Sequence, residues 1–249
     1  MKGIILAGGL GSRLGKLTQV TNKHLLPVYN LPMIWYPLKT LSKAGIKEVM
    51  VIVSGPHAGA FLPLLKNGEE FGFSKLLYGF QERPDGGIAD ALSIAEPFAG
   101  KDPVAVILGD NTTDADISGS VKSFDDIIKS KSDEPPVAQI FLKKVSDPKK
   151  FGVAVFNEDN KLVRIDEKPE SPASEYAVTG LYFYDFHVFK FIKQCVPSKR
   201  GELEITDINN LYLKNGNLRW VELGGFWQDA GSYEALLKAN EFWGHRSND

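Results

Sequence analysis

The sequence opens with a short apolar run that leads directly into a glycine-rich segment, residues 4–14 (IILAGGLGSRL). The run at 4–7 predicts a buried strand, because it is short, apolar and bounded by glycine. Glycines after a strand allow backbone N–H groups to turn toward an anion without interference from a Cβ atom. Arg13 adds a permanent charge that can fork onto phosphate oxygens. We therefore interpret the segment as a strand followed by a phosphate-binding loop; the alternative is a tight turn with a solvated arginine.

Two better-known glycine-rich loops do not fit this segment. The dinucleotide-binding fingerprint requires a third glycine where Leu14 stands and an acidic residue at the end of the second strand, where Ser54 stands. The P-loop of ATPases requires glycine in place of Leu10 and Ser or Thr in place of Leu17. The sequence thus excludes both a dehydrogenase loop and an ATPase P-loop.

Apolar runs alternate with helical patterns in the first half of the chain. There we expect strands at 4–7, 49–53, 76–80 and 104–108, and helices at 32–44, 59–65 and 88–95. This alternation predicts βαβ units and a mainly parallel sheet, with ligands at the carboxyl ends of its strands. The second half differs, with few helices between its strands. There we expect strands at 137–142, 152–156, 162–165 and 176–184, helices at 202–214 and 232–243, and a polar surface loop at 129–136.

The composition limits the classes of partner and compartment. The 249 residues are 43% hydrophobic and 24% charged, which is ordinary for a globular protein. A net charge of −2 gives no basic excess, so we expect no nucleic-acid partner. The single cysteine, Cys195, cannot form an internal disulfide and is interpreted as a part-buried structural thiol. The first apolar run is too short for a secretory signal and no run approaches 18 residues, so we expect a cytoplasmic protein without membrane contact.

Two aspartates follow elements that can position them for chemistry. Asp110 comes directly after the apolar strand at 104–108, beside a glycine, where a carboxylate can hold a hard cation. Its alternative role is an Asx turn that closes the strand. Asp229 lies just before the last predicted helix, where a carboxylate is favoured in any case. Local sequence alone leaves both roles open.

Further motifs follow the glycine loop in a fixed order. They are NKHLLPV (22–28), FGV (151–153), EKP (167–169), AVTGLYFYD (177–185), RGELEITDIN (200–209) and WQDAG (227–231). Together they resemble the sugar-nucleotide pyrophosphorylases, and among these the thymidylyltransferases, over essentially the whole chain. The resemblance implies a Rossmann-like α/β nucleotidyltransferase fold, with a mixed, mainly parallel central sheet flanked by helices. It also implies a single domain, 1–249, with a nucleotide-binding half at about 1–130 and a sugar-binding half at about 131–249.

The resemblance implies a reaction as well as a fold. A nucleotidyl group would pass from dTTP to α-D-glucose 1-phosphate, giving dTDP-glucose and pyrophosphate, in a homo-oligomer (a dimer or a tetramer). Mg²⁺ would be held by Asp110 and Asp229. Alternatives are a uridylyltransferase that uses UTP, another sugar-1-phosphate nucleotidyltransferase, or a non-catalytic nucleotide-binding subunit. The last is disfavoured because Arg13, Lys23 and Lys168 are present together with both aspartates.

The same resemblance assigns roles to individual residues. Arg13 would hold the leaving pyrophosphate, Lys23 would bridge the triphosphate, and Lys168 and Arg200 would seat the attacking phosphate. The nucleotide-binding set is Leu6, Gly8, Gly9, Gly11, Ser12, Arg13, Lys23, Gln81, Gly86, Gly87 and Asp110. The substrate-binding set is Asn111, Gly152, Glu167, Lys168, Val178, Arg200 and Trp227.

For the base, Gln81 can offer a donor and an acceptor together, which suits a thymine or uracil edge. A backbone N–H of Gly86 or Gly87 would meet the remaining carbonyl. Without the resemblance, Gln81 would be a residue that ends a strand, and Glu167 and Lys168 a surface ion pair.

The sequence departs from the family at three places. Lys16 stands where members usually carry proline, and Thr112 and Thr113 stand where longer members carry apolar residues. The chain also ends shortly after the last predicted helix, so it resembles the shorter members without additional C-terminal helices.

Overall fold

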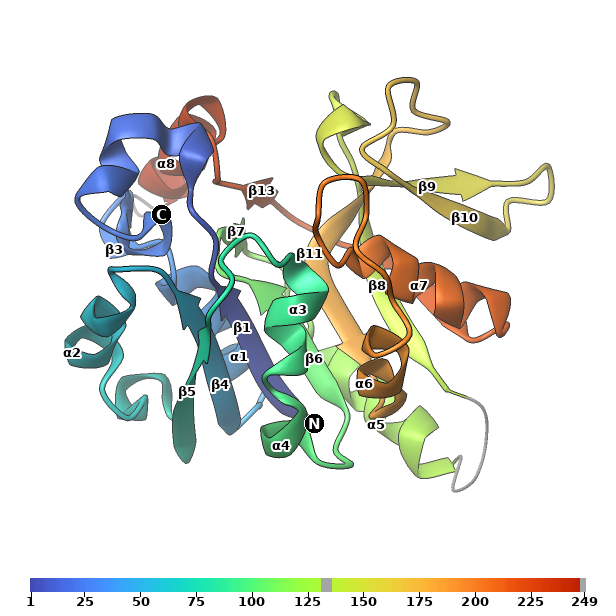
Figure 1. The fold of residues 1–249 in the computed structure, drawn as a ribbon, viewed down its shortest axis with the longest axis horizontal. Coiled ribbons are helices and arrows are strands. Elements are labelled where there is room, and N and C mark those ends of the chain that lie inside the picture. Colours follow the sequence, from blue (N-terminus) through green and yellow to red (C-terminus); the bar gives the residue numbers. More distant parts are fainter. Residues whose placement is uncertain (131–135, 247–249) are drawn as a thin grey trace.

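The computed structural model describes residues 1–130 and 136–246. A nine-stranded sheet runs through the middle of the molecule (Figure 1). In spatial order its main path is β10 (Leu162–Glu167), β9 (Gly152–Phe156), β11 (Tyr176–Tyr184), β6 (Val104–Leu108), β1 (Lys2–Ala7), β4 (Glu48–Ser54) and β5 (Lys75–Gln81). Two further strands, β8 (Ala138–Lys144) and β12 (Leu218–Glu222), continue the sheet beyond β11.

The first strand occupies the centre of a parallel region. Strand β1 pairs in parallel with both β4 and β6, with Ile5 opposite Val51 and Ile107. Strand β11 then joins β6 antiparallel, so the sheet is mixed. Side chains of β1 alternate between two cores and are buried on both faces, which explains why the run at 4–7 is apolar without interruption. The expected fold class is confirmed.

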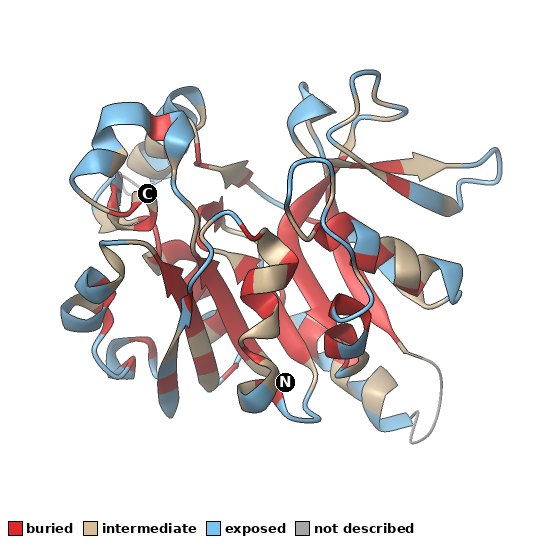
Figure 2. Ribbon diagram, in the orientation of Figure 1, coloured by how far each residue is buried: buried red, intermediate tan, exposed pale blue. Residues whose placement is uncertain are grey.

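Helices cover the two faces of this sheet. Helices α3 (Ile88–Ser93), α6 (His187–Ile192) and α7 (Ile205–Lys214) pack on the core that contains Ile4. Helices α1 (Trp35–Lys43), α2 (Phe61–Leu65) and α5 (Ser118–Ser130) pack on the core that contains Ile5. The short α4 (Glu96–Ala99) follows α3. In Figure 2 the strands at the centre of the sheet are buried, and the exposed residues gather on the loops and at the periphery.

Two small sheets lie apart from the main one. Strand β2 (Pro27–Val28) pairs with β3 (Leu31–Pro32), and helix α8 (Tyr233–Arg246) packs beside them in a third apolar cluster. Strand β7 (Asn111–Thr113) pairs antiparallel with β13 (Trp227–Asp229), with Asn111 opposite Asp229. This second pairing brings the segment after Asp110 against a segment more than a hundred residues later in the chain.

Several predicted boundaries were wrong. The helix expected at 32–44 begins at Trp35, because residues 31–32 pair with β2 instead. The helix expected at 202–214 begins at Ile205, because the Leu203 N–H donates to Gly86 and its carbonyl accepts from Ala89. The helix expected at 88–95 ends at Ser93.

Other elements were not predicted at all. Among them are helices α4, α5 and α6, strands β7, β12 and β13, and the β2–β3 hairpin. Of the polar loop expected at 129–136, residues 131–135 lie outside the described part of the chain.

Two expectations about the whole molecule can be compared with the structure. In the described ranges, 1–130 and 136–246, no helix has the length and apolar character needed to cross a bilayer. Cys195 is partly buried, and this burial raises the pKa of its thiol, as suits a structural residue.

Candidate active site

A cavity of about 700 Å³ opens at the carboxyl ends of the parallel strands. Gly8 and Gly9 follow β1, and the Gly9 N–H donates to Oγ of Ser54, the last residue of β4, at 2.9 Å. Gln81 ends β5, and Asp110 lies two residues beyond β6. The carboxyl ends of four neighbouring strands therefore surround one space. Parallel α/β sheets bind their ligands at this position.

The glycine loop has no room for side chains at its key positions. A Cβ on Gly8 would lie 2.6 Å from Oε1 of Gln81, and one on Gly11 would lie 2.7 Å from Cγ2 of Thr18. Gly9 and Gly11 also have φ values of 94° and 64°, which glycine tolerates best. Arg13 follows in a 3-10 helix, Ser12–Gln19, with its side chain 53% exposed. The loop thus presents backbone groups and one half-exposed cation to the cavity.

A buried ion pair forms the floor of the cavity beside this loop. Nζ of Lys23 lies 2.5 Å from Oδ2 of Asp110. Burial acts to raise the pKa of Asp110, but the ammonium of Lys23 outweighs it and holds that pKa well below its usual value. Asp110 is therefore a carboxylate at neutral pH.

Neighbouring His24 is buried, and burial lowers its pKa to about 3, so its imidazole is neutral. Its Nδ1 lies 2.7 Å from Oδ1 of Asn22, and its ring packs on Gly109, where a Cβ would lie 2.7 Å from Cδ2 of the ring. These contacts support a structural role for His24.

Asp229 lies close to Asp110 across Gly231. A Cβ on Gly231 would lie 2.8 Å from Oδ1 of Asp229 and 3.0 Å from Oδ2 of Asp110. Oδ1 of Asp229 accepts from the Gly231 N–H at 2.8 Å, and Oδ2 lies 3.6 Å from Nη2 of Arg13. Burial, reinforced by the negative charge of Asp110, raises the pKa of Asp229. Two desolvated carboxylates thus border one space, and the cations near Asp229 do not outweigh its burial and the charge of Asp110.

This donor set fits Mg²⁺. The ion prefers oxygen ligands and usually takes one or two carboxylates with phosphate oxygens and water, rather than an all-protein cage. Over residues 1–130 and 136–246, no group of three His, Cys, Asp or Glu side chains forms such a cage. A divalent cation between Asp110 and Asp229 would also remove the repulsion that raises the pKa of Asp229.

Asn111 holds this part of the site together. Its Oδ1 accepts from the Gly180 N–H at 3.0 Å and from Nε1 of Trp227 at 2.6 Å, and its Nδ2 donates to Oδ1 of Asp110 at 3.1 Å. A Cβ on Gly180 would lie 2.7 Å from the Asn111 amide, so this approach requires glycine. Asn111 was expected to bind substrate; in the structure both ends of its amide contact protein groups.

Charged residues from the second half of the chain line the opposite side. Nη2 of Arg200 lies 2.8 Å from both carboxylate oxygens of Glu204, and within 3.3 Å of Glu167 and Glu202. Glu167 accepts from Oγ1 of Thr206 at 2.5 Å. An anion bound by Arg200 therefore has to compete with these carboxylates for its guanidinium.

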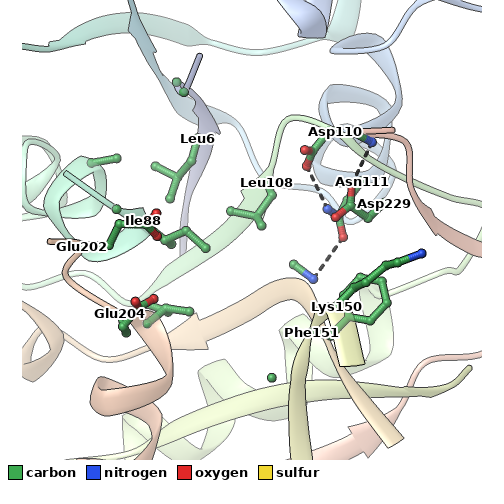
Figure 3. Close-up of a pocket in the computed structure, with 18 of the residues that line it drawn as sticks. Leu6, Ile88, Leu108, Asp110, Asn111, Lys150, Phe151, Glu202, Glu204 and Asp229 are labelled. Carbon is green, nitrogen blue, oxygen red and sulfur yellow. Dashed lines mark hydrogen bonds between the residues drawn. The ribbon is translucent and has the colours of Figure 1, made fainter. Parts of the chain in front are cut away.

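The structure brings nearly all predicted site residues to this cavity. Those that line it are Leu6, Gly8, Gly9, Gly11, Ser12, Arg13, Lys23, Gln81, Gly87, Asp110, Asn111, Gly152, Glu167, Lys168, Val178, Arg200, Trp227 and Asp229. Gly86 is not among the lining residues: it is buried, its N–H donates to the carbonyl of Arg83 and its own carbonyl accepts from the Leu203 N–H. Figure 3 shows Asp110, Asn111 and Asp229 together on one side of the cavity, with Glu202, Glu204 and Ile88 on the other.

Sequence reasoning missed other residues of the lining. They include Lys149, Lys150, Tyr182, Glu204 and Thr206. The two lysines directly precede the FGV motif, and Glu204 and Thr206 lie within the RGELEIT motif, so adjacency to motifs already recognised was the available signal.

The fold and this cavity define an α/β enzyme of the nucleotidyltransferase class. The chain belongs to the nucleotidyl transferase family, whose sequence pattern matches residues 2–246. It is similar to glucose-1-phosphate thymidylyltransferases of Neisseria meningitidis serogroup A (46% identity) and Mycolicibacterium smegmatis (42%), in each case over 97% of this chain and 82% of the relative. The family and enzyme class expected from the motifs are confirmed.

Solved structures agree with this assignment. One from Bacillus anthracis, assigned as a glucose-1-phosphate thymidylyltransferase and complexed with sucrose, has a TM-score of 0.89 and 47% identity over 97% of this chain and 94% of that one. An apo UDP-glucose pyrophosphorylase has a TM-score of 0.82 at 20% identity, over 99% of both chains. The second likeness shows a shared fold.

Proposed function

We propose that this enzyme transfers a thymidylyl group from dTTP to α-D-glucose 1-phosphate, giving dTDP-glucose and pyrophosphate. One observation supports the proposal: a single cavity is lined by Arg13 and Lys23, which pair with the two aspartates, and by Lys168 and Arg200, which pair with Glu167. The first pair suits a triphosphate and the second a sugar phosphate. The names of the relatives supply the particular base and sugar.

The chain's own residues act by alignment and charge neutralisation. The sugar phosphate is already anionic, so its oxygen can attack the α-phosphorus without a general base. The oxygen–phosphorus bond to the sugar phosphate forms as the bond to the β-phosphate oxygen breaks, and the electron pair leaves with pyrophosphate. Lys168 and Arg200 would hold the attacking phosphate, while Arg13 and Lys23 would take up the charge that develops on the leaving group.

Mg²⁺ would be held by Asp110 and Asp229, and when bound it would supply further neutralisation of the phosphate oxygens. Lys23 contacts Asp110 directly in the structure. Its ammonium can therefore turn from the carboxylate to a phosphate once a cation has neutralised Asp110.

The sugar would occupy the side of the cavity formed by β9, β10 and β11. Gly152 begins β9, and a Cβ there would lie 3.2 Å from Oγ1 of Thr206 and 3.6 Å from Oε2 of Glu167. Oε1 of Glu167 pairs with both Arg200 and Lys168, and it would accept from sugar hydroxyls once these two cations turn to phosphate. Val178 and Trp227 complete the wall, and Trp227 is fixed by its hydrogen bond to Asn111.

The base would lie between the glycine loop and helix α3, over Leu6, Ile88 and Leu108. Gly87 lines this region, whereas the N–H of Gly86 is already donated to Arg83. We therefore assign the backbone contact with the base to Gly87. Gln81 at the floor would contact the base edge.

The test is a matrix of dTTP, dUTP, UTP, dCTP and ATP against several sugar 1-phosphates, scored by pyrophosphate release with Mg²⁺ and with EDTA. We expect the greatest kcat/KM for dTTP with glucose 1-phosphate, and no release in EDTA. A preference for UTP would move the enzyme to the uridylyltransferases. Tight nucleotide binding without release from any pair would overturn the proposed activity.

A further inference from the structure

The amide of Gln81 is held in one orientation by its neighbours. Gln81 ends β5, its side chain is 3% exposed, and it lines the cavity beside Gly8. Its Nε2 donates to Oδ2 of Asp90 at 2.8 Å and to the carbonyl of Gly87 at 3.3 Å. A carboxylate and a backbone carbonyl are both acceptors, so only the amide nitrogen can face them. The orientation follows from the partners themselves.

The oxygen of the same amide then has to face the other way. It lies beside Gly8, where a Cβ would be 2.6 Å from Oε1. Within residues 1–130 and 136–246 the hydrogen bonds of Gln81 are the two made by Nε2, so Oε1 has no donor there. A nine-tenths-buried side chain thus turns an unpartnered acceptor toward the cavity.

Asp90 is itself fixed in place. It lies in the first turn of α3, and its carboxylate packs so closely on Gly86 that any Cβ there would overlap it. Loop 84–87 is in turn tied to the start of α7 through the Gly86 carbonyl and the Leu203 N–H at 2.9 Å. The carboxylate therefore has little freedom to release the Gln81 amide.

An acceptor at the floor of the pocket discriminates among pyrimidines. Thymine and uracil carry a proton on N3 and can donate to Oε1, whereas N3 of cytosine is an acceptor and would face it unfavourably. We propose that Asp90 is a positioning residue that fixes Oε1 of Gln81 toward the base and so selects nucleotides with a protonated N3. This inference rests on the proposed function, in which Gln81 contacts the base.

A second role for Asp90 has to be separated from this one. A carboxylate in the first turn of a helix also stabilises the helix through its dipole. That role would change stability, and would change the rates with all nucleotides alike. A ratio of rates for two nucleotides that differ in the N3 proton is therefore the informative quantity.

The experiment compares kcat/KM for dUTP and dCTP in the parent enzyme and in Asp90→Asn. An asparagine has nearly the same shape but can either accept or donate, so the Gln81 amide can turn over, although Gly87 still favours the original orientation. We expect the dUTP to dCTP ratio to fall about tenfold, the effect of weakening one charge-assisted hydrogen bond. The control Glu96→Gln removes a carboxylate from α4 that pairs with exposed Lys193, and should leave the ratio within about twofold.

Each outcome bears on the inference. An unchanged ratio in Asp90→Asn, with the variant folded by circular dichroism, would overturn it. Asp90→Ala provides a second variant, with the same expected fall, if asparagine is not tolerated. In the parent enzyme, a dUTP to dCTP ratio below about ten would also contradict a fixed acceptor. Cytosine has no N3 proton to donate to Oε1, and a buried polar group left unpaired should lower kcat/KM for dCTP by more than that.

Failure of the proposed function would look different. The parent would then release no pyrophosphate from any nucleotide and sugar pair. Calorimetric titration with dUDP and dCDP would still test the orientation of Gln81. Equal affinity of the parent for both would overturn the inference, and preference for dUDP that Asp90→Asn reduces would support it.

Discussion

Nζ of Lys23 lies 2.5 Å from Oδ2 of Asp110, and the two side chains are only 14% and 6% exposed. Lys23 comes from a short 3-10 helix after the glycine loop, while Asp110 follows β6, 87 residues away. The pair therefore fastens the loop to the sheet. Under the proposed function the pair also lies where the triphosphate binds. The stability of the fold and the reaction therefore depend on the same two side chains.

Removing the lysine should leave a buried carboxylate without its counter-ion. We expect Lys23→Met to lower the free energy of unfolding by about 3 kcal/mol at pH 7. Lys23 depresses the pKa of Asp110, so its stabilisation is present at neutral pH and is lost as pH falls below the usual Asp range. Urea denaturation of parent and variant in EDTA at pH 7 and at about pH 3 should show a difference that shrinks in acid.

The matched control is Lys75→Met. Its Nζ lies 3.9 Å from Oε2 of Glu48, and both side chains are largely exposed. Its loss should cost no more than about 0.5 kcal/mol. If Lys23→Met and Lys75→Met lowered the free energy of unfolding equally, this would contradict the claim that Lys23 stabilises a buried carboxylate.

The effect of Asp229 on the stability of the fold should have the opposite dependence on pH. Its pKa is raised, so its ionised form is disfavoured in the fold, and stability falls as pH rises through the range between its ordinary and its raised pKa. At pH 7 in EDTA this penalty is present, and Asp229→Asn should raise the Tm; with Mg²⁺ the same variant should abolish pyrophosphate release. Below the ordinary pKa of Asp the gain in Tm should vanish. A lower Tm for the variant at pH 7 would show that the carboxylate is already neutralised.

The burial of His24 predicts a separate loss of stability as the pH falls. Because burial lowers its pKa to about 3, the fold keeps it neutral, and this stabilisation is present above about pH 6.5 and is lost as pH falls toward 3. Between pH 7 and pH 5 the unfolding free energy should lose about 2 kcal/mol that His24→Gln does not lose. Exposed His245→Gln serves as the control and should retain the parent's pH dependence. Parallel pH profiles for parent and His24→Gln would refute the assignment.

Arg200 should affect the sugar phosphate and spare the nucleotide. We expect Arg200→Ala to raise the KM for glucose 1-phosphate roughly tenfold to a hundredfold, since charge-assisted contacts with a phosphate contribute about 1.5–3 kcal/mol. The KM for dTTP should change little. Arg164→Ala is the control, because Arg164 is exposed on β10 and pairs with Asp166. If Arg200→Ala changed only the KM for dTTP, Arg200 would bind the nucleotide and not the sugar phosphate.

The parallel half of the fold could be predicted because its central strands, β1 and β6, are buried on both faces. The run at 104–108 forms β6 at those bounds, and the run at 4–7 lies within β1. Helix α5 was missed although Val121 and Phe124 are spaced for one buried face. Its serines and charges gave the segment a polar appearance. Strand β12 was missed because most of its residues are exposed and carry no alternation.

The sequence motifs predicted which residues line the site, but they predicted the contacts between those residues less well. Gly8 and Asp110 follow strands β1 and β6, so their shared position followed from the rule for parallel sheets, whereas Lys23 was found through the NKHLLPV motif alone. The pairing of Arg200 with Glu204, and of Gln81 with Asp90, depends on how α7 and α3 meet the loop at 84–87. Spacing along the chain carries no information on such contacts.

The pairing of Asn111 with Asp229 joins β7 to β13, and with it the two carboxylates of the site. During synthesis the glycine loop, Lys23 and Asp110 emerge long before Asp229 does. A ribosome-bound chain that stops before residue 227 would hold the nucleotide loop but lack the strand that pairs with β7. Under the proposed function, catalytic competence depends on a segment that is made more than a hundred residues after Asp110, so pyrophosphate release from staged translation arrests would report when β13 joins β7.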